Sequence, residues 1–375
     1  MRFVARLWAV RLAIALSVGL STWTSGAAQS LTWLGTFGGD RSEAWGVSAD
    51  GSVVVGWAKN ADWDRRAFRW TASGGMQGLG TLGGGSSEAY GVSADGSVVV
   101  GWAQNASYQW SAFRWTASGG MQDLGTLGGN ESAAYGVSAD GSVVVGRVQN
   151  ASNRYRALRW TQAGGMQDLG TLGGTESEAW GVSANGSVVV GWAQNASGWL
   201  RAFRWTASGG MQDLGTLGGA ESEAWGVSAD GSVVVGAARI GSGYIRAFRW
   251  TQAGGMQGLG TLGGAESEAW GVSANGSVVV GRADDAGNAW RAFRWTVSGG
   301  MEDLNLTYAS LLPSGSRLEV AYAISLDGRY IVGYGINATT GRREGFLVDT
   351  VPEPASLTVL GVGLAGLIGL KRRKR

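Results

Sequence analysis

The stretch AWGVSADGSVVVG, residues 44–56, recurs in close copies that start at positions 89, 134, 179, 224 and 269. Each copy starts 45 residues after the preceding one, and a looser version, AYAISLDGRYIVG, starts at Ala321. Self-similarity at a fixed period of this size is the sequence signature of a repeat architecture. The 375 residues of the chain are therefore interpreted as one array rather than as several unrelated domains.

Four short strands are expected within one period, residues 178–222. Asn185-Gly186 lies between apolar runs and predicts a hairpin, because both turn residues can take positive φ. Val188–Val190 is a β-branched run that suits a buried strand. After a loop of variable sequence, Arg201–Trp205 alternates with period two, and Met211–Leu217 is expected to form a last, glycine-rich strand.

Four short strands per 45 residues fit one blade of a β-propeller. A β-solenoid is the alternative, although its coils typically need fewer residues and fewer chain reversals. The hairpin and the phenylalanine strand each occur seven times, at Trp45, Tyr90, Tyr135, Trp180, Trp225, Trp270 and Tyr322, and at Phe68, Phe113, Leu158, Phe203, Phe248, Phe293 and Phe346. We therefore predict an all-β fold, a seven-bladed β-propeller over residues 29–350. The large residue at the Trp45 position and the Phe-Arg-Trp residues are expected to pack between blades.

The order of strands within a blade stays open at this stage. The glycine-rich segment appears once before the first hairpin, as LTWLGTFGG at 31–39, and six copies follow. If the hairpin strand is innermost, residues 31–39 complete the seventh blade and close the ring. If the glycine-rich strand is innermost, each blade is contiguous in sequence and the ring has no such closure.

Both ends of the chain carry export features. Residues 1–28 place arginines before an apolar stretch and end on Gly26-Ala27-Ala28, which predicts a cleaved signal peptide and export through the Sec translocon. A retained membrane anchor is the alternative there. Residues 351–375 contain Pro-Glu-Pro, a 16-residue apolar run and five cations. As a helix the run would span ~24 Å, and the cations, by snorkelling, would extend it and stay in the cytoplasm.

This C-terminal tail resembles the PEP-CTERM sorting signal of Gram-negative bacteria. The resemblance implies that an exosortase, a membrane transpeptidase-like enzyme, recognises Pro352, Glu353 and Pro354. It also implies that the following segment is a retention anchor that processing removes, and that the protein accompanies exopolysaccharide production. An ordinary tail anchor is the alternative. The cationic end of the signal is formed by Lys371, Arg372, Arg373, Lys374 and Arg375.

The internal motifs A-F-R-W and L-G-T-L-G-G resemble those of the HAF-repeat family of bacterial extracellular proteins. The resemblance runs from Leu31 to about Asp349, but Arg or Ser always replaces the histidine that opens the family's motif. It implies an extracellular location and no defined activity. Together with the tail, it predicts a protein of the cell envelope, cell surface or extracellular matrix.

The composition excludes several functions. The chain has no cysteine and no histidine, which excludes disulfides, thiolate metal sites and Ser-His-Asp or Cys-His catalysis. The sequence pI of about 9.0 comes from the two ends, because residues 29–352 hold 22 basic and 27 acidic residues, net −5. That balance lacks the basic surface of a nucleic-acid-binding protein. We expect no nucleic-acid partner, no cofactor and no metal.

Two connections vary between the repeats while the other two are nearly constant. The loop after VVVG and the junction before the repeating aromatic change most, and in an up-and-down blade they emerge on the same face. Diversified loops on a rigid scaffold are where binding residues concentrate. Their aromatic rings can stack on sugar rings; the alternative is that they fold back onto the blade edges. The candidate binding residues are Trp63, Tyr108, Trp110, Tyr155, Trp199, Tyr244 and Trp290.

Two charged sets accompany the repeats. Glutamates precede the repeating aromatic and are expected to ring one end of the channel, paired with arginines of the phenylalanine strand. The glutamates are Glu43, Glu88, Glu178, Glu223 and Glu268, and the arginines are Arg66, Arg156, Arg201, Arg246 and Arg291. Asp284, Asp285 and Asn288 offer clustered oxygens for Ca²⁺, but their spacing fits no known calcium loop.

The sequence thus favours a non-enzymatic, exported surface or matrix protein that binds exopolysaccharide through the variable face of its propeller. One alternative is a carboxylate-dependent glycosidase or lyase, which needs two acids in distinct environments. The divergent seventh repeat is the place for them, around Glu319, Asp327 and Glu344. The other alternative is a structural spacer without a ligand.

Overall fold

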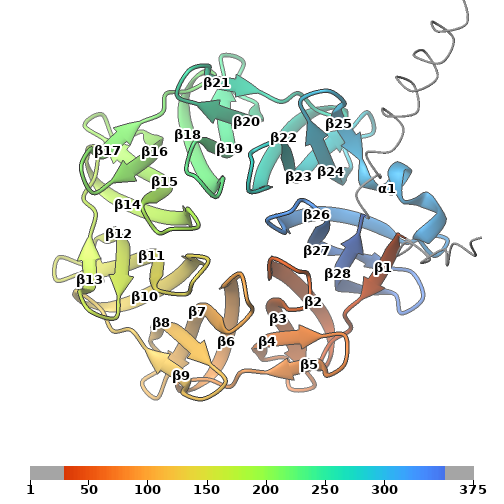
Figure 1. The fold of residues 1–375 in the computed structure, drawn as a ribbon, viewed down its shortest axis with the longest axis horizontal. Helices are drawn as coiled ribbons and strands as arrows, with labels where there is room; N and C mark the ends of the chain where they lie inside the picture. Colours follow the sequence, from red (N-terminus) through yellow and green to blue (C-terminus); the bar gives the residue numbers. More distant parts are fainter. Residues whose placement is uncertain (1–28, 351–375) are drawn as a thin grey trace, which may run out of the picture.

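The sheets of the protein form a ring around a central axis (Figure 1). The computed structural model describes residues 29–350, so the predicted signal peptide and the predicted sorting signal lie outside the described residues. Strands dominate the described chain, and the strands of one repeat pair with one another in antiparallel fashion. The prediction of an all-β repeat array is confirmed.

The first repeat sets the pattern for the others. Its strands β2 (Gly38–Val47), β3 (Val54–Asn60), β4 (Arg65–Thr71) and β5 (Gly75–Gly78) pair in chain order. Five four-stranded sheets follow with the same order. They are β6 (Gly83–Val92), β7 (Val98–Asn105), β8 (Trp110–Thr116), β9 (Gly120–Asp123); β10 (Gly128–Val137), β11 (Val143–Asn150), β12 (Tyr155–Thr161), β13 (Gly165–Asp168); β14 (Gly173–Val182), β15 (Val188–Asn195), β16 (Leu200–Thr206), β17 (Gly210–Asp213); β18 (Gly218–Val227), β19 (Val233–Ile240), β20 (Ile245–Thr251), β21 (Gly255–Gly258); β22 (Gly263–Val272), β23 (Val278–Asp285), β24 (Trp290–Thr296) and β25 (Gly300–Asp303).

The two ends of the described chain meet in one group of strands. β26 (Arg317–Ile324), β27 (Tyr330–Asn337) and β28 (Arg342–Asp349) pair in order, and β1 (Ser30–Trp33) adds to β28 as an antiparallel neighbour. A single parallel bridge between β2 and β28 joins this group to the first repeat in one eight-stranded sheet. The strands β2, β6, β10, β14, β18, β22 and β26 line the central cavity. The hairpin strand is therefore innermost, and the N-terminal strand closes the ring.

The glycine-rich strand is shorter than predicted. Of the segment 211–217, only the start lies in a strand, β17, and the rest is a connection that crosses to the next sheet. Gly215 and Gly218 have φ of 84° and 97°, values that side chains disfavour, and they turn the chain there. The inner strand β18 already begins at Gly218, so the variable junction lies inside that strand.

The hairpin turn also differs from the predicted two-residue turn. Of the pair Asp50-Gly51, only Gly51 has a positive φ, 71°. The Ser48 amide donates to the Val53 carbonyl at 2.9 Å, which makes a wider loop. The Asp50 carboxylate accepts hydrogen bonds from the Ser52 amide and from the Ser48 hydroxyl, at 3.0 and 2.7 Å. The repeating Asp or Asn thus serves as an acceptor that organises the loop.

The core lies between neighbouring sheets. In one such cluster, Val55 and Ala67 of the first repeat pack with Val99 and Phe113 of the second, and all four are fully buried. Burial of a large aromatic ring removes about 150–250 Å² from water, which stabilises the fold by several kcal/mol at ~25 cal/mol per Å². The predicted packing of the phenylalanine position between repeats is confirmed, since Phe68 and its six equivalents are fully buried.

A buried serine links each of six junctions between sheets. The Ser87 hydroxyl donates to the Gly80 carbonyl at 2.6 Å and accepts from the Ala67 amide of the preceding sheet at 3.0 Å. Ser132, Ser177, Ser222 and Ser267 repeat this link. Ser42 makes it across the closure, where it accepts from the Gly345 amide at 2.9 Å. The sequence shows this serine in six repeats, with Glu319 at the equivalent position of the last one, but its role was not predicted.

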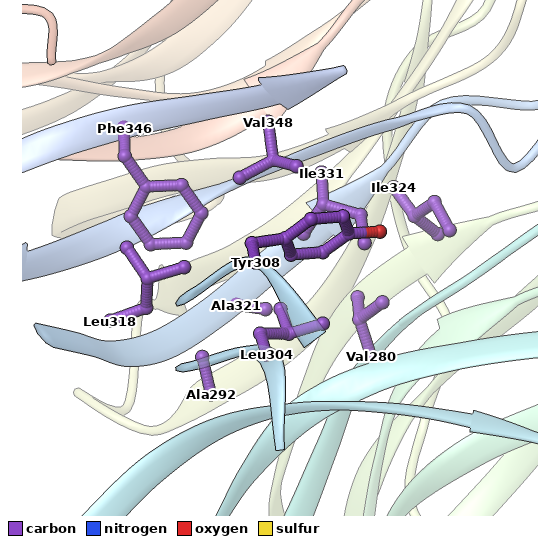
Figure 2. Packing of buried hydrophobic residues seen from close by; sticks show 10 residues of the cluster. All are labelled: Val280, Ala292, Leu304, Tyr308, Leu318, Ala321, Ile324, Ile331, Phe346 and Val348. Atoms are coloured by element: carbon purple, nitrogen blue, oxygen red, sulfur yellow. The ribbon is translucent and has the colours of Figure 1, made fainter. Parts of the chain in front are cut away.

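A short helical segment replaces the usual connection before the last group of strands. It comprises α1 (Leu304–Thr307) and the 3₁₀ turn η1 (Ala309–Leu311). Leu304 and Tyr308 are buried against Leu318, Phe346 and neighbouring side chains (Figure 2). The divergent sequence MEDLNLTYA therefore still contributes to the core.

Candidate functional site

The repeating aromatics fill the centre of the ring. With the glycine and apolar residues that follow them, they line a cavity of about 240 Å³ on the axis. Tyr135 stacks on Trp180 with ring centroids 4.2 Å apart, and Trp225 stacks on Trp270 at 4.0 Å. Trp270 also contacts Trp45 across the centre at 6.1 Å. The rings thus contact rings of neighbouring repeats, as predicted, but they do so around the axis and not within the interfaces between the sheets.

The predicted glutamates lie next to this aromatic cluster, and four of them are buried and ion-paired. Arg41 pairs with Glu43 of its own strand. Arg65, which belongs to the preceding sheet, pairs with Glu88. Arg147 Nη1 lies 2.9 Å from Glu178 Oε1. Arg282 holds Glu268 through two bonds of 2.8 Å, from Nε to Oε2 and from Nη2 to Oε1.

The arginines predicted to pair with these glutamates have other partners. Arg66, Arg156, Arg201 and Arg291 form ion pairs with Asp64, Asp168, Asp213 and Asp285, and Arg246 donates to the Ile245 carbonyl. That pairing prediction is therefore wrong. The true partners come from three different positions of the repeat, of which Arg147 and Arg282 share one, so the repeat pattern hides them.

Glu223 is the member of the set with no ion pair among residues 29–350. It lines a pocket of about 120 Å³ together with Glu221, Glu268 and Arg239. Burial, followed by repulsion from Glu178 and Glu268, raises the pKa of Glu223 to about 7, although a hydrogen bond from Trp225 opposes the rise. Glu223 is therefore partly protonated at neutral pH.

Glu223 predicts a pH dependence of stability. Because its pKa rises from 4.5 to about 7 on folding, the folded state holds a proton that the unfolded state has released between these values. The resulting contribution to the free energy of unfolding is fully present below pH 4.5 and is lost as the pH rises through 7. The free energy of unfolding declines by an amount on the order of 3 kcal/mol over this range. We expect Glu223→Gln to remove this decline, measured as the difference in urea unfolding between variant and wild type from pH 4 to 8. Parallel pH curves for the two proteins would contradict the assignment.

Two repeats lack the glutamate, and in the last of them Val320 takes its place. Residues 131–135 read ESAAY, so Ala133 occupies the position of Glu88 and Glu178. A pocket of about 160 Å³ opens at this place, lined by Trp102, Trp110, Glu131, Tyr135 and Arg147 among others. Trp102 and Trp110 form one wall, with ring centroids 3.7 Å apart.

The loop aromatics fall into two structural groups. Four are at least half exposed: Trp63 at 65%, Tyr108 at 73%, and Trp199 and Tyr244 at 50% each. The other three, Trp110, Tyr155 and Trp290, begin strands and pack on residues of the neighbouring strand. Arg147 lies 4.5 Å from the Tyr155 ring, and Arg282 lies 4.0 Å from the Trp290 ring. The structure therefore separates the predicted binding residues into rings that are at least half exposed and rings that pack on the neighbouring strand. Of the exposed rings, Trp63 has Lys59 Nζ over it, 4.7 Å from the ring centroid.

The strand order places the variable connections together. Because the strands of each repeat are antiparallel and pair in chain order, the loop between the second and third strands and the junction into the first strand leave the sheet at the same end. The turns at Ser48–Val53 and Thr71–Gly75 leave at the opposite end. We call these ends the variable face and the constant face.

The acidic residues considered for Ca²⁺ or catalysis already have local bonds. Asp285 accepts from the Gly287 and Ala289 amides and pairs with Arg291, as part of its turn. Glu319 pairs with Arg317 and Arg343, and Asp327 accepts from the hydroxyl of Ser325. Glu344 accepts from Asn337 and Thr340.

Comparisons with solved structures agree on the fold. The BP39L lectin from Burkholderia pseudomallei matches with a TM-score of 0.51 and 9% identity, over 86% of this chain and 98% of the lectin. A prolyl endopeptidase matches with a TM-score of 0.50 and 13% identity, over 82% of this chain and 46% of that one. TolB from Acinetobacter baumannii matches with a TM-score of 0.47 and 11% identity, over 85% of this chain and 68% of TolB. At these identities the likeness concerns the fold alone, which is propeller-like.

One family model matches the chain. Residues 350–374 match the PEP-CTERM protein-sorting motif, which confirms that part of the sequence prediction. The motif implies processing by an exosortase, anchoring at the C-terminus and a place at the cell surface. Within residues 29–350, no helix has the length and apolar character to cross a bilayer. The comparison with curated proteins gives no match.

Proposed function

We propose that the protein is a non-enzymatic, exported seven-bladed propeller of the HAF-repeat type that binds exopolysaccharide at the surface of a Gram-negative bacterium. Export would use the signal peptide over residues 1–28 and the Sec translocon. The sorting motif at residues 350–374 supports surface location. Closure of the strand group β26–β28 by β1 supports the seventh blade.

The observation that carries the binding proposal is the set of exposed rings on the variable face. Four rings are each at least half exposed, although their burial would stabilise the fold: Trp63, Tyr108, Trp199 and Tyr244. They project from loops whose tips the repeats diversify. A pair of aromatic rings contributes roughly 0.5–1.5 kcal/mol beyond area burial, and we expect a ring stacked on a sugar to contribute an amount of the same order. Several such contacts along one polymer add up to useful affinity.

Alanine at all four exposed positions is expected to weaken retention on the host's own exopolysaccharide by roughly thirtyfold or more, which corresponds to about 0.5 kcal/mol per ring. Co-sedimentation of purified protein with the polysaccharide measures this. The matched control replaces the exposed residues Gln162, Gln252 and Val297 of the constant face by alanine and should bind as wild type. Equal binding by wild type and the aromatic variant would contradict the proposal.

One observation favours the glycosidase or lyase alternative. Glu223, with its raised pKa, and Glu221, which pairs with Arg239 at 2.8 Å, line the same pocket. A protonated and an ionised carboxyl in one pocket are what general acid catalysis on a glycosidic bond requires. Shortening of polysaccharide chains by wild type, and its loss in Glu223→Gln, would replace the non-enzymatic proposal by this one.

A further inference from the structure

The pocket at Ala133 lies where a repeat lacks the carboxylate that five of the seven repeats carry. Five repeats place Glu at this position, and the four ion-paired copies are held by arginine. The repeat of Glu268 and Arg282 is the template for the repeat of Ala133 and Arg147, because the two pairs occupy the same positions three periods apart. In the template, Nε and Nη2 of Arg282 bind both oxygens of Glu268 at 2.8 Å.

The groups that would hold such a carboxylate are present and unused. Arg147 engages Glu178 through Nη1 only, so its Nε and Nη2 atoms have no partner among residues 29–350. Tyr90 donates its hydroxyl to Glu88 at 2.6 Å. Tyr135, its equivalent beside Ala133, has a hydroxyl without a partner in the same part of the chain. Both side chains line the pocket. Hydrogen bonds from arginine to a carboxylate are among the strong ones, so these free donors suit a ligand with a carboxylate.

The rest of the pocket fits a sugar ring. Its volume of about 160 Å³ is several times that of one water, ~30 Å³. Trp110 supplies an apolar wall beside Trp102, and it is 38% exposed, so it is open to a ligand that enters from the variable face. Glu131, which accepts a hydrogen bond from Tyr155, also lines the pocket and can accept bonds from hydroxyl groups.

We infer that the pocket at Ala133 binds one hexuronate residue of an acidic polysaccharide, with its carboxylate on Arg147 and Tyr135 and its ring against Trp110. This inference rests on the proposed function and names the substrate class: a polymer that contains uronic acid. The four repeats with an ion-paired glutamate carry their own carboxylate in the equivalent place.

The test is calorimetric titration of the full-length protein, purified in mild detergent, with a trisaccharide of galacturonate and with a neutral hexose trisaccharide. We expect the acidic trisaccharide to bind roughly tenfold or more tightly than the neutral one, as one charge-assisted pair predicts. Ala133→Glu restores the sequence of the other repeats and should abolish this binding without lowering the melting temperature. Ala133→Ser, which leaves the pocket open, should bind as wild type.

Undiminished binding by Ala133→Glu, equal binding of the two trisaccharides, or no binding of either would overturn the hexuronate site. These outcomes are separable from failure of the proposed function. Wild type that binds the host polysaccharide through its loop aromatics but ignores galacturonate refutes only the pocket. Wild type that binds galacturonate at this pocket but not the host polysaccharide refutes only the proposed function.

Discussion

Gly191→Ala is expected to destabilise the protein by roughly 3 kcal/mol or more, a large part of the total stability of a domain. A Cβ at Gly191 would lie 1.9 Å from the Glu178 carbonyl oxygen and 2.9 Å from the Ala179 Cα. Both atoms belong to the backbone of the inner strand β14, which cannot rotate away as a side chain would. The change should force β14 and β15 apart. Urea unfolding followed by tryptophan fluorescence measures the loss.

Gly258→Ala is the matched control. A Cβ there would meet only Leu217 Cδ1, at 3.5 Å, and other repeats carry Asp at this position. We expect this variant to unfold within about 0.5 kcal/mol of wild type, as surface substitutions usually do. If Gly191→Ala unfolds at the same urea concentration as Gly258→Ala, that result would contradict the close approach of β14 and β15.

Removal of β1 is expected to open the ring. A form that begins at Leu34 and ends at Thr350 lacks the four pairs between β1 and β28 and the edge-to-face contact of Trp33 with Phe346, at 6.4 Å. Loss of a packed tryptophan alone typically costs about 3–5 kcal/mol. The edge of β28 would then be exposed and prone to pair with another molecule. We expect a lower melting temperature and association on size-exclusion chromatography.

The control for this truncation begins at Gln29 and ends at the same residue, so both forms lack the same tail. It retains every strand that the structure describes and should be monomeric, with a melting temperature like that of the full chain. Two forms that melt together would show that the N-terminal strand contributes little to closure.

The repeat period made much of the fold predictable. The hairpin, the buried phenylalanine position and the alternation of variable and constant connections all follow from local sequence, because they depend on residues within one period. Which strand of each sheet lies innermost could not be predicted in this way. It depends on whether Ser30–Trp33 pairs with Arg342–Asp349, a contact between the two ends of the array that no single repeat encodes.

The candidate site was less predictable than the fold. The aromatics of the variable loops were identified, but they start from three different places in the loop, so only some remain exposed. The glutamate partners were misassigned, because Arg65 and Arg147 reach into the next sheet while Arg282 stays in its own. The replacement of the glutamate by Ala133 is visible in the sequence. Its link to a binding pocket depends on the Nε and Nη2 atoms of Arg147, whose partners only the structure shows.

The most direct test of the central claim is hydrogen exchange of the full-length protein with and without exopolysaccharide from its own host. The proposal predicts saturable protection of the variable connections, such as residues 60–65, 105–110 and 195–200, and no change at the constant turns 48–53 and 71–75. Protection confined to the constant face would contradict the binding surface. Absence of protection at saturating polysaccharide would contradict binding itself and leave a structural spacer as the function.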